Sequence, residues 1–298
     1  MREIIENIDY NFKTKFYYNY DTSKNVWFRT GGKAKVFCIV DNEKELSIIL
    51  QNLKDIPYEV IGAGSNILIR DSGYEGFLIK LGKNFNQIEI KKSNLTVGAS
   101  ILDINLSKFA QLNNLKNFEF YSGIPGTVGG AVKMNAGCFG SETKDILIDV
   151  KTINNKGEIN TINKKNLNLN YRQSYLPEGD IIISANFHCN SGDKNKIAKK
   201  MNEIKINREK TQPLKEKTSG STFKNPKNNF AAKLIEMSNC KGLSEGGIFV
   251  SNKHANFLIN KQQGNANQIE ELGNKIIEKV YDNFKIKLEW EIKIIGQK

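Results

Sequence analysis

Apolar residues recur along this chain with two different spacings, which predict a mixture of strands and helices. Short runs that are apolar, or that alternate with polar residues, indicate strands, and apolar residues three or four positions apart indicate helices. Strands are predicted at 34–40, 76–81, 146–153, 157–162, 181–188, 255–259 and 288–296, with one more ending at residue 69 and a hairpin at 86–98. Helices are predicted at 46–53, 101–112, 194–209, 229–237 and 269–280. Residues 1–24 are expected to form an irregular arm.

Two of the predicted helices carry additional signals. Asn42 and Glu45 stand three positions apart before the apolar run of 46–53, which is the spacing of a capping box. The helix 194–209 is rich in lysine, and only a few of its residues are apolar. The residues of this helix that are expected to face inward are Ile197, Met201, Ile204 and Ile206.

The stretch 121–138 combines five glycines with apolar neighbours, so it is predicted to be a buried loop and not a flexible linker. Glycine admits positive φ and lets backbone N–H groups come close to a ligand, and Pro125 stiffens the entry. A flat cofactor or a phosphate would fit such a loop. Taken alone, a tight turn between two core elements explains the pattern equally well.

A second glycine-rich stretch, 62–66, lies between two short β-rich runs and is predicted to be a hairpin-like loop. Its successive N–H groups are suited to form an anion-binding nest. Ile67 stands where the Rossmann fingerprint has its third glycine, and the segment after it is predicted to be a strand. The motif Gly-x-x-x-x-Gly-Lys-Ser/Thr does not occur in the sequence. The two stretches therefore indicate a different cofactor architecture.

Length and charge narrow the class of protein. The 298 residues are 39% hydrophobic, enough for two or three subdomains with their own cores. The net charge, 44 minus 32 or +12, suits an anionic substrate. Because the lysines are dispersed without interleaved stacking aromatics, nucleic-acid binding is not expected. No apolar run approaches the roughly 18 residues of a membrane span, and residues 1–19 are too charged for a secretory signal. We therefore expect no membrane partner and a cytoplasmic location.

Metal binding is not expected either. The four cysteines are far apart and lack a Cys-x-x-Cys spacing, and the chain contains only two histidines. The cysteines are instead expected in or near the core. They are Cys38, Cys138, Cys189 and Cys240.

Two motifs are highly specific: Ser-Gly-Ile-Pro-Gly at 122–126 and Gly-Ser-x-Phe-Lys-Asn-Pro at 220–226. They occur in order with the glycine nest at 62–66, Tyr-Arg-Gln-Ser at 171–174, Lys-His-Ala-Asn-Phe at 253–257 and the closing segment 288–296. In this combination the chain resembles the UDP-N-acetylenolpyruvoylglucosamine reductase family of bacterial cell-wall synthesis. The resemblance extends from about residue 27 to residue 296.

The resemblance implies an α+β fold. Two α+β subdomains, at 1–84 and 85–207, would hold FAD between them, as in the vanillyl-alcohol-oxidase type of FAD-binding fold. A third α+β domain, at 208–298, would bind the substrate, and its terminal strand would carry a catalytic glutamate. The FAD contacts that the family motifs imply are Gly62, Ala63, Gly64, Ser65, Asn66, Ile124, Gly126, Thr127 and Gly129.

The resemblance also implies the reaction. NADPH reduces the non-covalently bound FAD and departs, and the enolpyruvyl ether of a UDP-sugar takes its place. Hydride passes from flavin N5 to the methylene carbon, and a proton is added to the carbon that bears the carboxylate. The product is the lactyl ether, UDP-N-acetylmuramate, a precursor of peptidoglycan. No obligate protein partner is expected.

Three residues at the family's positions are implied to be catalytic. Arg172 would hold the substrate carboxylate in its fork. Glu291, which would share one face of the terminal strand with Glu289, would assist enol formation, provided that burial raises its pKa. Ser221 would donate the proton, polarised by its neighbours. The expected substrate contacts are Lys224, Asn225, His254, Arg208 and Lys210.

Other interpretations stay open. Taken singly, Arg172 could bridge two subdomains, Glu291 could be a solvated strand residue, and Ser221 could cap a loop. A related FAD oxidase or dehydrogenase acting on a hydroxy acid would need no Ser221, and a non-catalytic nucleotide-binding protein would need none of the three. Arg172 and Ser221 are only 221 minus 172, or 49, positions apart. The resemblance is therefore to the shorter branch of the family, which lacks a tyrosine-bearing lid.

Overall fold

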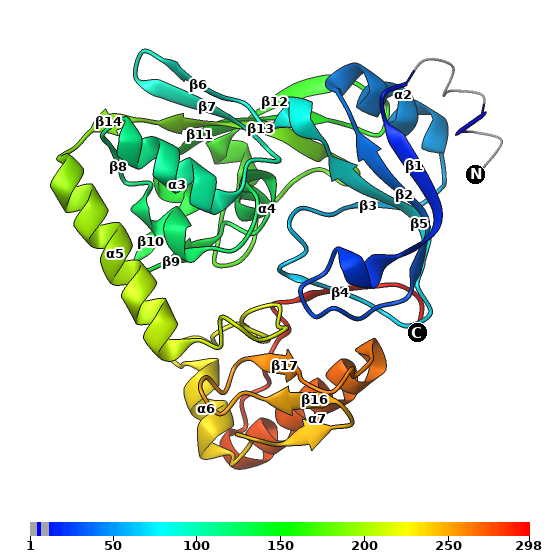
Figure 1. Ribbon diagram of the computed structural model, residues 1–298, viewed down its shortest axis with the longest axis vertical. Helices are drawn as coiled ribbons and strands as arrows, with labels where there is room; N and C mark the ends of the chain where they lie inside the picture. Colours follow the sequence, from blue (N-terminus) through cyan, green and yellow to red (C-terminus); the bar gives the residue numbers. More distant parts are fainter. Residues whose placement is uncertain (1–4, 7–11) are drawn as a thin grey trace. The chain divides into compact units, whose positions relative to one another are not determined.

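The structure, a computed structural model, describes residues 5–6 and 12–298 and divides into two compact units (Figure 1). The first unit consists of Met1–Tyr18, Val36–Ala63 and Gly76–Ile206. The second consists of Asn19–Lys35, Gly64–Glu75 and Asn207–Lys298. The chain thus contributes three separate segments to each unit. The division at 84/85 and 207/208 that the sequence indicated stays a prediction.

An antiparallel five-stranded sheet, in the order β12-β11-β13-β7-β6, forms the centre of the first unit. Its strands are β6 (Ile88–Lys91), β7 (Asn94–Gly98), β11 (Leu147–Ile153), β12 (Ile159–Asn163) and β13 (Ile181–His188). The predicted hairpin at 86–98 and the three predicted strands that follow are confirmed. Residues of β13 are buried on both faces in its first half, which explains its run of three isoleucines.

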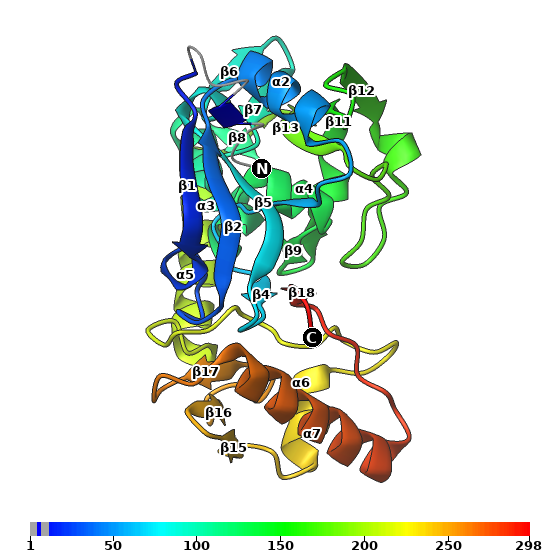
Figure 2. The same cartoon turned by 90° about the vertical axis from the view of Figure 1, so that its right-hand side faces the viewer.

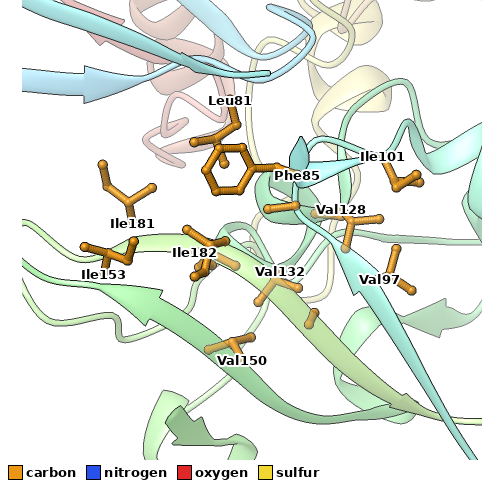
Figure 3. Packing of buried hydrophobic residues seen from close by; sticks show 14 of the residues in the cluster. Leu81, Phe85, Val97, Ile101, Val128, Val132, Val150, Ile153, Ile181 and Ile182 are labelled. Carbon is orange, nitrogen blue, oxygen red and sulfur yellow. The ribbon is translucent and has the colours of Figure 1, made fainter. Parts of the chain in front are cut away.

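Helices α3 (Asp103–Leu112) and α4 (Val128–Lys133) belong to the same unit. Figure 3 shows Phe85, Val128, Val132 and Ile182 pointing toward one another in the buried core. The prediction that 121–138 is a loop throughout is wrong at α4. Tertiary contacts stabilise this helix: the Gly129 N–H donates to the carbonyl of Ala99 over 3.0 Å, and an added Cβ at Gly129 would lie only 3.0 Å from the Ala99 Cβ.

A second sheet has four strands in the order β1-β2-β5-β3, and helix α2 (Glu43–Leu53) follows β2 in the chain. As predicted, Asn42 caps the helix by accepting a hydrogen bond from the Glu45 N–H over 3.0 Å. The other half of the predicted capping box is wrong: the Glu45 carboxylate accepts hydrogen bonds from the Thr14 N–H and hydroxyl instead of from the Asn42 backbone N–H. The strands are β1 (Lys15–Asp21), β2 (Lys33–Val40), β3 (Tyr58–Val60) and β5 (Tyr74–Leu81).

The expectation of an irregular arm at 1–24 is wrong for β1, whereas residues 1–4 and 7–11 lie outside the described residues. Tyr17 of β1 packs on the neighbouring strand β2, and the centres of the Tyr17 and Phe37 rings are 6.1 Å apart. Strands β3 and β4 (Ile67–Ile69) do not form a hairpin around 62–66 as predicted. Each instead runs parallel to another strand, β3 to β5 and β4 to β18 (Lys293–Ile295).

The second unit contains a three-stranded antiparallel sheet and the helices α6 (Ala231–Met237) and α7 (Ala266–Phe284), shown in yellow and orange in Figure 2. Its strands are β15 (Ser244–Glu245), β16 (Ile248–Val250) and β17 (Leu258–Asn260). The predicted helix at 269–280 is confirmed within α7, and Asn265 begins α7 with a capping box. Gly273 gives α7 room for Trp290, because an added Cβ would lie 2.2 Å from the indole ring.

Three predictions about residues 194–296 need correction. Helix α5 (Lys194–Thr211) buries Ile197 and Ile204 as expected, but Ile206 is 55% exposed because it lies off their line. The predicted strand 288–296 is regular only at β18, so Glu289 and Glu291 flank a single bridge at Trp290 instead of sharing a strand. The predicted strand 255–259 begins three residues later, as β17.

The remaining elements are short. They are β8 (Leu115–Lys116), β9 (Gly137–Cys138), β10 (Ser141–Glu142) and β14 (Asn190–Ser191), and the 3₁₀ helices η1 (Thr22–Lys24), η2 (Lys83–Phe85), η3 (Glu119–Gly123), η4 (Thr143–Asp145) and η5 (Lys164–Leu167).

Asp103, the first residue of α3, carries a fully buried carboxyl group. Among the described residues, neither of its carboxyl oxygens has a hydrogen-bond partner. Burial raises the pKa of Asp103 well above its ordinary value of 3.8. The folded protein therefore retains a proton that the unfolded chain releases, and above pH 3.8 this ionisation favours unfolding.

Asp103→Asn should therefore stabilise the protein at neutral pH. The gain in unfolding free energy should grow by about 1.4 kcal/mol per pH unit above the ordinary aspartate pKa and level off at the raised pKa. Urea unfolding of both proteins over a series of pH values measures this difference. A difference that does not change with pH would contradict the assignment of a protonated Asp103.

Candidate active site

In the first unit, Gly62 lies against Thr127, so two predicted cofactor contacts far apart in sequence come together. An added Cβ at Gly62 would lie 2.4 Å from the Thr127 hydroxyl oxygen. The neighbouring Gly126 is held by its carbonyl, which accepts a hydrogen bond from the Asp103 N–H over 3.1 Å. Ile124 ends η3, where its N–H donates to the carbonyl of Tyr121. This arrangement leaves no space for a side chain at residue 62.

Arg172 occupies a tight turn in the first unit. Asn170 and Gln173 exchange backbone hydrogen bonds across this turn, and Arg172 has a φ of +54°. A long side chain in the left-handed region is strained by about 1 kcal/mol or more, and such strain concentrates at functional sites. The guanidinium lies 5.0 Å from the centre of the Tyr171 ring and donates to the Gly137 carbonyl over 3.1 Å.

The end of the glycine-rich stretch anchors this turn. The Asn135 side-chain amide donates to the carbonyl of Asn170 over 2.9 Å, and the Ser174 hydroxyl donates to the carbonyl of Lys133 over 2.7 Å. Asn135 and Ser174 are both buried. The structure thus joins the predicted catalytic arginine to the stretch 121–138 by hydrogen bonds on both sides of the turn.

In the second unit, Gly64 lies against the backbone of residues 25–26. It has a φ of +71°, and an added Cβ would lie 1.8 Å from the carbonyl oxygen of Asn25. The carbonyl of Gly64 accepts a hydrogen bond from the Trp27 N–H over 3.0 Å. Gly64 therefore satisfies two requirements that exclude other residues: a left-handed backbone and a close approach to a second chain segment.

Ser221 begins a short extended segment that runs beside residues 256–258. Ser221 forms an isolated antiparallel bridge with Phe257. The Thr222 N–H donates to the Asn256 carbonyl over 2.8 Å, and the Leu258 N–H donates to the Thr222 hydroxyl over 3.3 Å. Thr222 is fully buried, whereas Ser221 is partly exposed. These bonds fix the backbone next to the predicted proton donor, which is itself only partly buried.

Glu291 lies on the other edge of the same segment. Its N–H donates to the carbonyl of Thr222, and the Lys224 N–H donates to the carbonyl of Glu289, both over 2.8 Å. Glu291 is partly buried, whereas the Glu289 side chain is 75% exposed and lies 3.5 Å from the Lys224 ammonium group. The structure therefore brings Ser221 and Glu291, which are 70 positions apart in sequence (291 minus 221), onto neighbouring backbone segments.

Asn66, predicted to contact the cofactor, joins this arrangement. Its side-chain amide donates to the carbonyl of Glu291 over 3.1 Å, and its own carbonyl accepts from the Lys293 N–H over 3.2 Å. Ser65 precedes it in the same partly buried turn. A cofactor contact and a catalytic residue of the prediction are therefore held together within the second unit.

The predicted substrate contacts are placed differently from one another. The Asn225 side-chain oxygen accepts a hydrogen bond from the N–H of Ala231, the first residue of α6, over 2.9 Å. His254 is partly buried with its ring 4.6 Å from that of Phe257, and burial, with help from Lys241, lowers its pKa. The imidazole is therefore neutral at neutral pH.

Arg208 and Lys210 lie in the last turn of α5. The Arg208 guanidinium donates to the Gln212 side chain over 3.0 Å. Lys210 is exposed. The role of these two residues stays a prediction.

The backbone of residues 62–64 fits an anionic group such as the diphosphate of FAD. In the described part of the chain, the N–H groups of Gly62 and Ala63 have no hydrogen-bond partner, and the same holds for Gly64. Backbone N–H groups that no side chain covers bind phosphate oxygens.

The described residues contain no group of three His, Cys, Asp or Glu side chains that could hold a metal ion. None of the described helices is long and apolar enough to cross a membrane.

Thr222 and Asn256 are central to this arrangement, yet the sequence analysis did not assign them a role. Both side chains are buried and bonded to the backbone. The available signal was a polar residue within an apolar run, at 255–259, where an amide must find buried partners.

Comparisons with known proteins point to one family. Residues 212–295 match the family model described as "UDP-N-acetylenolpyruvoylglucosamine reductase, C-terminal domain", and residues 34–163 match an FAD binding domain. The UDP-N-acetylenolpyruvoylglucosamine reductase of Rickettsia conorii is 44% identical over 286 residues, covering 96% of this chain and 97% of the relative. The corresponding protein of Rickettsia prowazekii is 42% identical over the same shares.

A solved structure shows the same likeness. The crystal structure of UDP-N-acetylenolpyruvylglucosamine reductase from Thermus caldophilus superposes with a TM-score of 0.83 at 31% identity. The match covers 96% of this chain and all of the Thermus chain. The fold predicted from the resemblance, a two-subdomain FAD-binding fold followed by a C-terminal domain, is thereby confirmed.

Gly64→Ala should abolish the binding of FAD or weaken it at least about tenfold, equivalent to about 1.4 kcal/mol. The added methyl group overlaps the Asn25 carbonyl, so the turn must move. Gly140→Ala is the matched control, because Gly140 also has a positive φ, +81°, but its Cβ would meet no atom within 4 Å. Flavin absorbance per protein after purification, and titration of the apoprotein with FAD, measure the effect. Equal loss of flavin in both variants would show that strain in φ, and not the close approach, is responsible.

Proposed function

The chain belongs to the UDP-N-acetylenolpyruvoylglucosamine reductase family, and from this premise we propose the roles that its own residues take in the family's reaction. The protein is an FAD-dependent oxidoreductase that uses NADPH to reduce the enolpyruvyl ether of UDP-N-acetylglucosamine to UDP-N-acetylmuramate in peptidoglycan precursor synthesis. Bound FAD supplies hydride transfer, from NADPH to the methylene carbon of the enolpyruvyl group.

One observation supports the assignment of the second unit's catalytic residues: Ser221 and Glu291 lie on backbone segments that are hydrogen-bonded to each other through Thr222. Addition of hydride to the methylene carbon leaves negative charge on the carbon next to the carboxylate. That carbon takes a proton to complete the reduction. Ser221, whose backbone is held on the Asn256 side by the Thr222 N–H, donates this proton and regains one from water.

Glu291 assists by stabilising the enolic form of the substrate carboxylate. An uncharged carboxylic acid can donate a hydrogen bond to the oxygen on which charge develops. The carbonyl of Glu291 is fixed by the Asn66 side chain and its N–H by Thr222, so the residue is held from both sides of its backbone. A fixed backbone favours a defined direction of approach for the side chain.

Arg172 binds the substrate carboxylate. A guanidinium pairs with a carboxylate through two parallel hydrogen bonds, and its charge stabilises the enolate that forms next to that group. The strained turn of Arg172 and its contacts with Tyr171 and Gly137 support this role, because they restrict the side chain before substrate arrives.

The remaining contacts form part of the proposal. The N–H groups of residues 62–64 bind the FAD diphosphate. Gly126, Thr127 and Gly129 shape the adjacent surface through close backbone packing. His254, neutral at the working pH, offers a hydrogen bond to the substrate. Lys224 and Asn225 contact the substrate near Ser221, and Arg208 and Lys210 contact its diphosphate.

We further propose that the enzyme works in the cytoplasm with small molecules only, without nucleic acid, membrane or an obligate protein partner. Its four cysteines are free thiols, which favours a reducing compartment. Burial raises the pKa of Cys38, Cys189 and Cys240, so these thiols are poor nucleophiles.

Anaerobic stopped-flow absorbance tests the function itself. NADPH should bleach the flavin band of the purified protein, and the UDP-enolpyruvyl sugar should then restore it. Bleaching without recovery would favour an FAD enzyme acting on another substrate, such as a hydroxy acid. A protein that cannot be loaded with FAD would contradict the function as a whole.

Ser221→Ala should separate the two half-reactions. Reduction of the flavin by NADPH needs no proton from Ser221 and should change by less than about twofold, whereas reoxidation by the UDP-sugar should slow by roughly 10²- to 10⁴-fold. Both rates come from the same stopped-flow traces. An equal loss in both half-reactions would contradict the role of proton donor.

Glu291→Gln should slow reoxidation by roughly 100-fold or more without loss of bound FAD, since an amide is a weaker hydrogen-bond donor than a carboxylic acid to the oxygen on which charge develops. Glu289→Gln is a matched control on the other side of Trp290, where the side chain is exposed and pairs with Lys224. The control should keep its rate, because exposed ion pairs contribute about 0 to 1 kcal/mol. Loss of flavin from the Glu291 variant would show a structural role instead.

A further inference from the structure

The Asn256 side chain forms hydrogen bonds with the backbone of Phe223, as a neighbouring strand would. Phe223 belongs to the extended segment that begins at Ser221. The Phe223 N–H donates to the Asn256 side-chain carbonyl over 3.0 Å, and the Asn256 side-chain amide donates to the Phe223 carbonyl over 2.8 Å. The main-chain carbonyl of Asn256 also accepts from the Thr222 N–H over 2.8 Å. One residue therefore makes three hydrogen bonds to two consecutive residues of the segment.

The side-chain bonds occur where water is excluded. Asn256 is 4% exposed and Phe223 is 1% exposed. A buried backbone N–H or C=O without a partner costs about 1 to 3 kcal/mol. The primary amide of asparagine offers one donor and one acceptor at the spacing of a peptide group, so it satisfies both groups of Phe223 at once.

The hydrogen bonds between the Asn256 side chain and Phe223 matter for the site because Ser221 lies two residues before Phe223. The other edge of the segment is bonded to Glu289 and Glu291. Without the Asn256 side chain, Phe223 would have to rotate or shift to find partners for its backbone, and the displacement would extend along the extended segment to Ser221. A shift of about 1 Å at a reacting group can cost a factor of roughly 100 in rate.

We infer that Asn256 is a positioning residue, which sets the place of the Ser221 hydroxyl by completing the backbone hydrogen bonds of Phe223. The inference rests on the proposed function, in which Ser221 donates the proton. Asn256 does not take part in the chemistry itself. Asn256 therefore affects the rate at which the UDP-sugar reoxidises the flavin, where the proton is needed, and not the rate at which NADPH reduces it.

Asn260 provides a matched control. It is a second buried asparagine of the same unit, 3% exposed, with side-chain hydrogen bonds to the backbone of Phe28 and Gly264. Its removal leaves comparable buried groups without partners, but not on the Ser221 segment. Asn256→Ala should slow flavin reoxidation by the UDP-sugar roughly 10- to 100-fold and leave reduction by NADPH within about twofold. Asn260→Ala should lower the melting temperature similarly and leave the ratio of the two rates unchanged.

Asn256→Asp adds a readout that a loss of stability would not move, and it applies even if the alanine variant does not fold. A protonated aspartate can donate to the Phe223 carbonyl and accept from its N–H, as the amide does, whereas the carboxylate repels that carbonyl. Burial raises the pKa of such a carboxyl group. The reoxidation rate of Asn256→Asp, divided by that of the unchanged protein, should therefore rise as the pH falls. A ratio that is constant or falls would overturn the inference.

Combining Asn256→Ala with Ser221→Ala separates this inference from the proposed function. If Asn256 acts by placing the hydroxyl, its substitution should cost no more than about threefold once the hydroxyl is gone, because residues that act as a unit are non-additive. A full effect in both backgrounds would overturn the role of Asn256 alone. If Ser221→Ala itself left reoxidation unchanged, the assignment of Ser221 in the proposed function would fail.

Discussion

Hydrogen bonds along both edges of the segment Thr222–Lys224 are the constraint on which the catalytic part of the second unit depends. Thr222 and Phe223 are buried, so their backbone groups must all find partners inside the protein. One edge is satisfied by residues 256–258 and the other by 289–291. The three segments come from distant parts of the sequence, and main-chain bonds fix their register. Ser221 and Glu291 are neighbours because of these bonds.

A second constraint is steric. Gly64 must approach the Asn25 carbonyl, and Gly62 must approach Thr127, so neither position has space for a side chain. The same absence of side chains leaves backbone N–H groups accessible to an anionic ligand. The net charge of +12 attracts a substrate and a hydride donor that both carry phosphates. Local packing and overall charge thus favour the same class of ligand.

Sequence patterns predicted elements whose signals are local. The strands of the five-stranded sheet, helix α7 and the Asn42 cap follow from apolar spacing and capping chemistry alone. Helix α4 was missed because glycine lowers helix propensity, while tertiary bonds to Ala99 and Ile101 stabilise its first turn. Ile206 was misplaced because an isolated isoleucine carries no information about which face is covered.

The site was harder to predict from the residues themselves. Ser221 and Glu291 are ordinary polar residues taken singly, and only the resemblance to a family marked them. Which residues hold them in place depends on pairings across the fold, such as Asn256 with Phe223 and Asn66 with Glu291, and no local pattern encodes these. The terminal strand was predicted too long for the same reason, since a single bridge at Trp290 replaces a continuous ladder.

Amide hydrogen exchange measured residue by residue tests the central claim most directly, because it reports the backbone hydrogen bonds themselves. The amides of Thr222, Phe223 and Glu291 should all exchange slowly, and at similar rates, because each is bonded within one arrangement. The amide of Lys227, in an exposed turn nearby, supplies the fast reference. Exchange of Phe223 or Glu291 as fast as that of Lys227 would contradict the account, since Ser221 and Glu291 would then lack a common support.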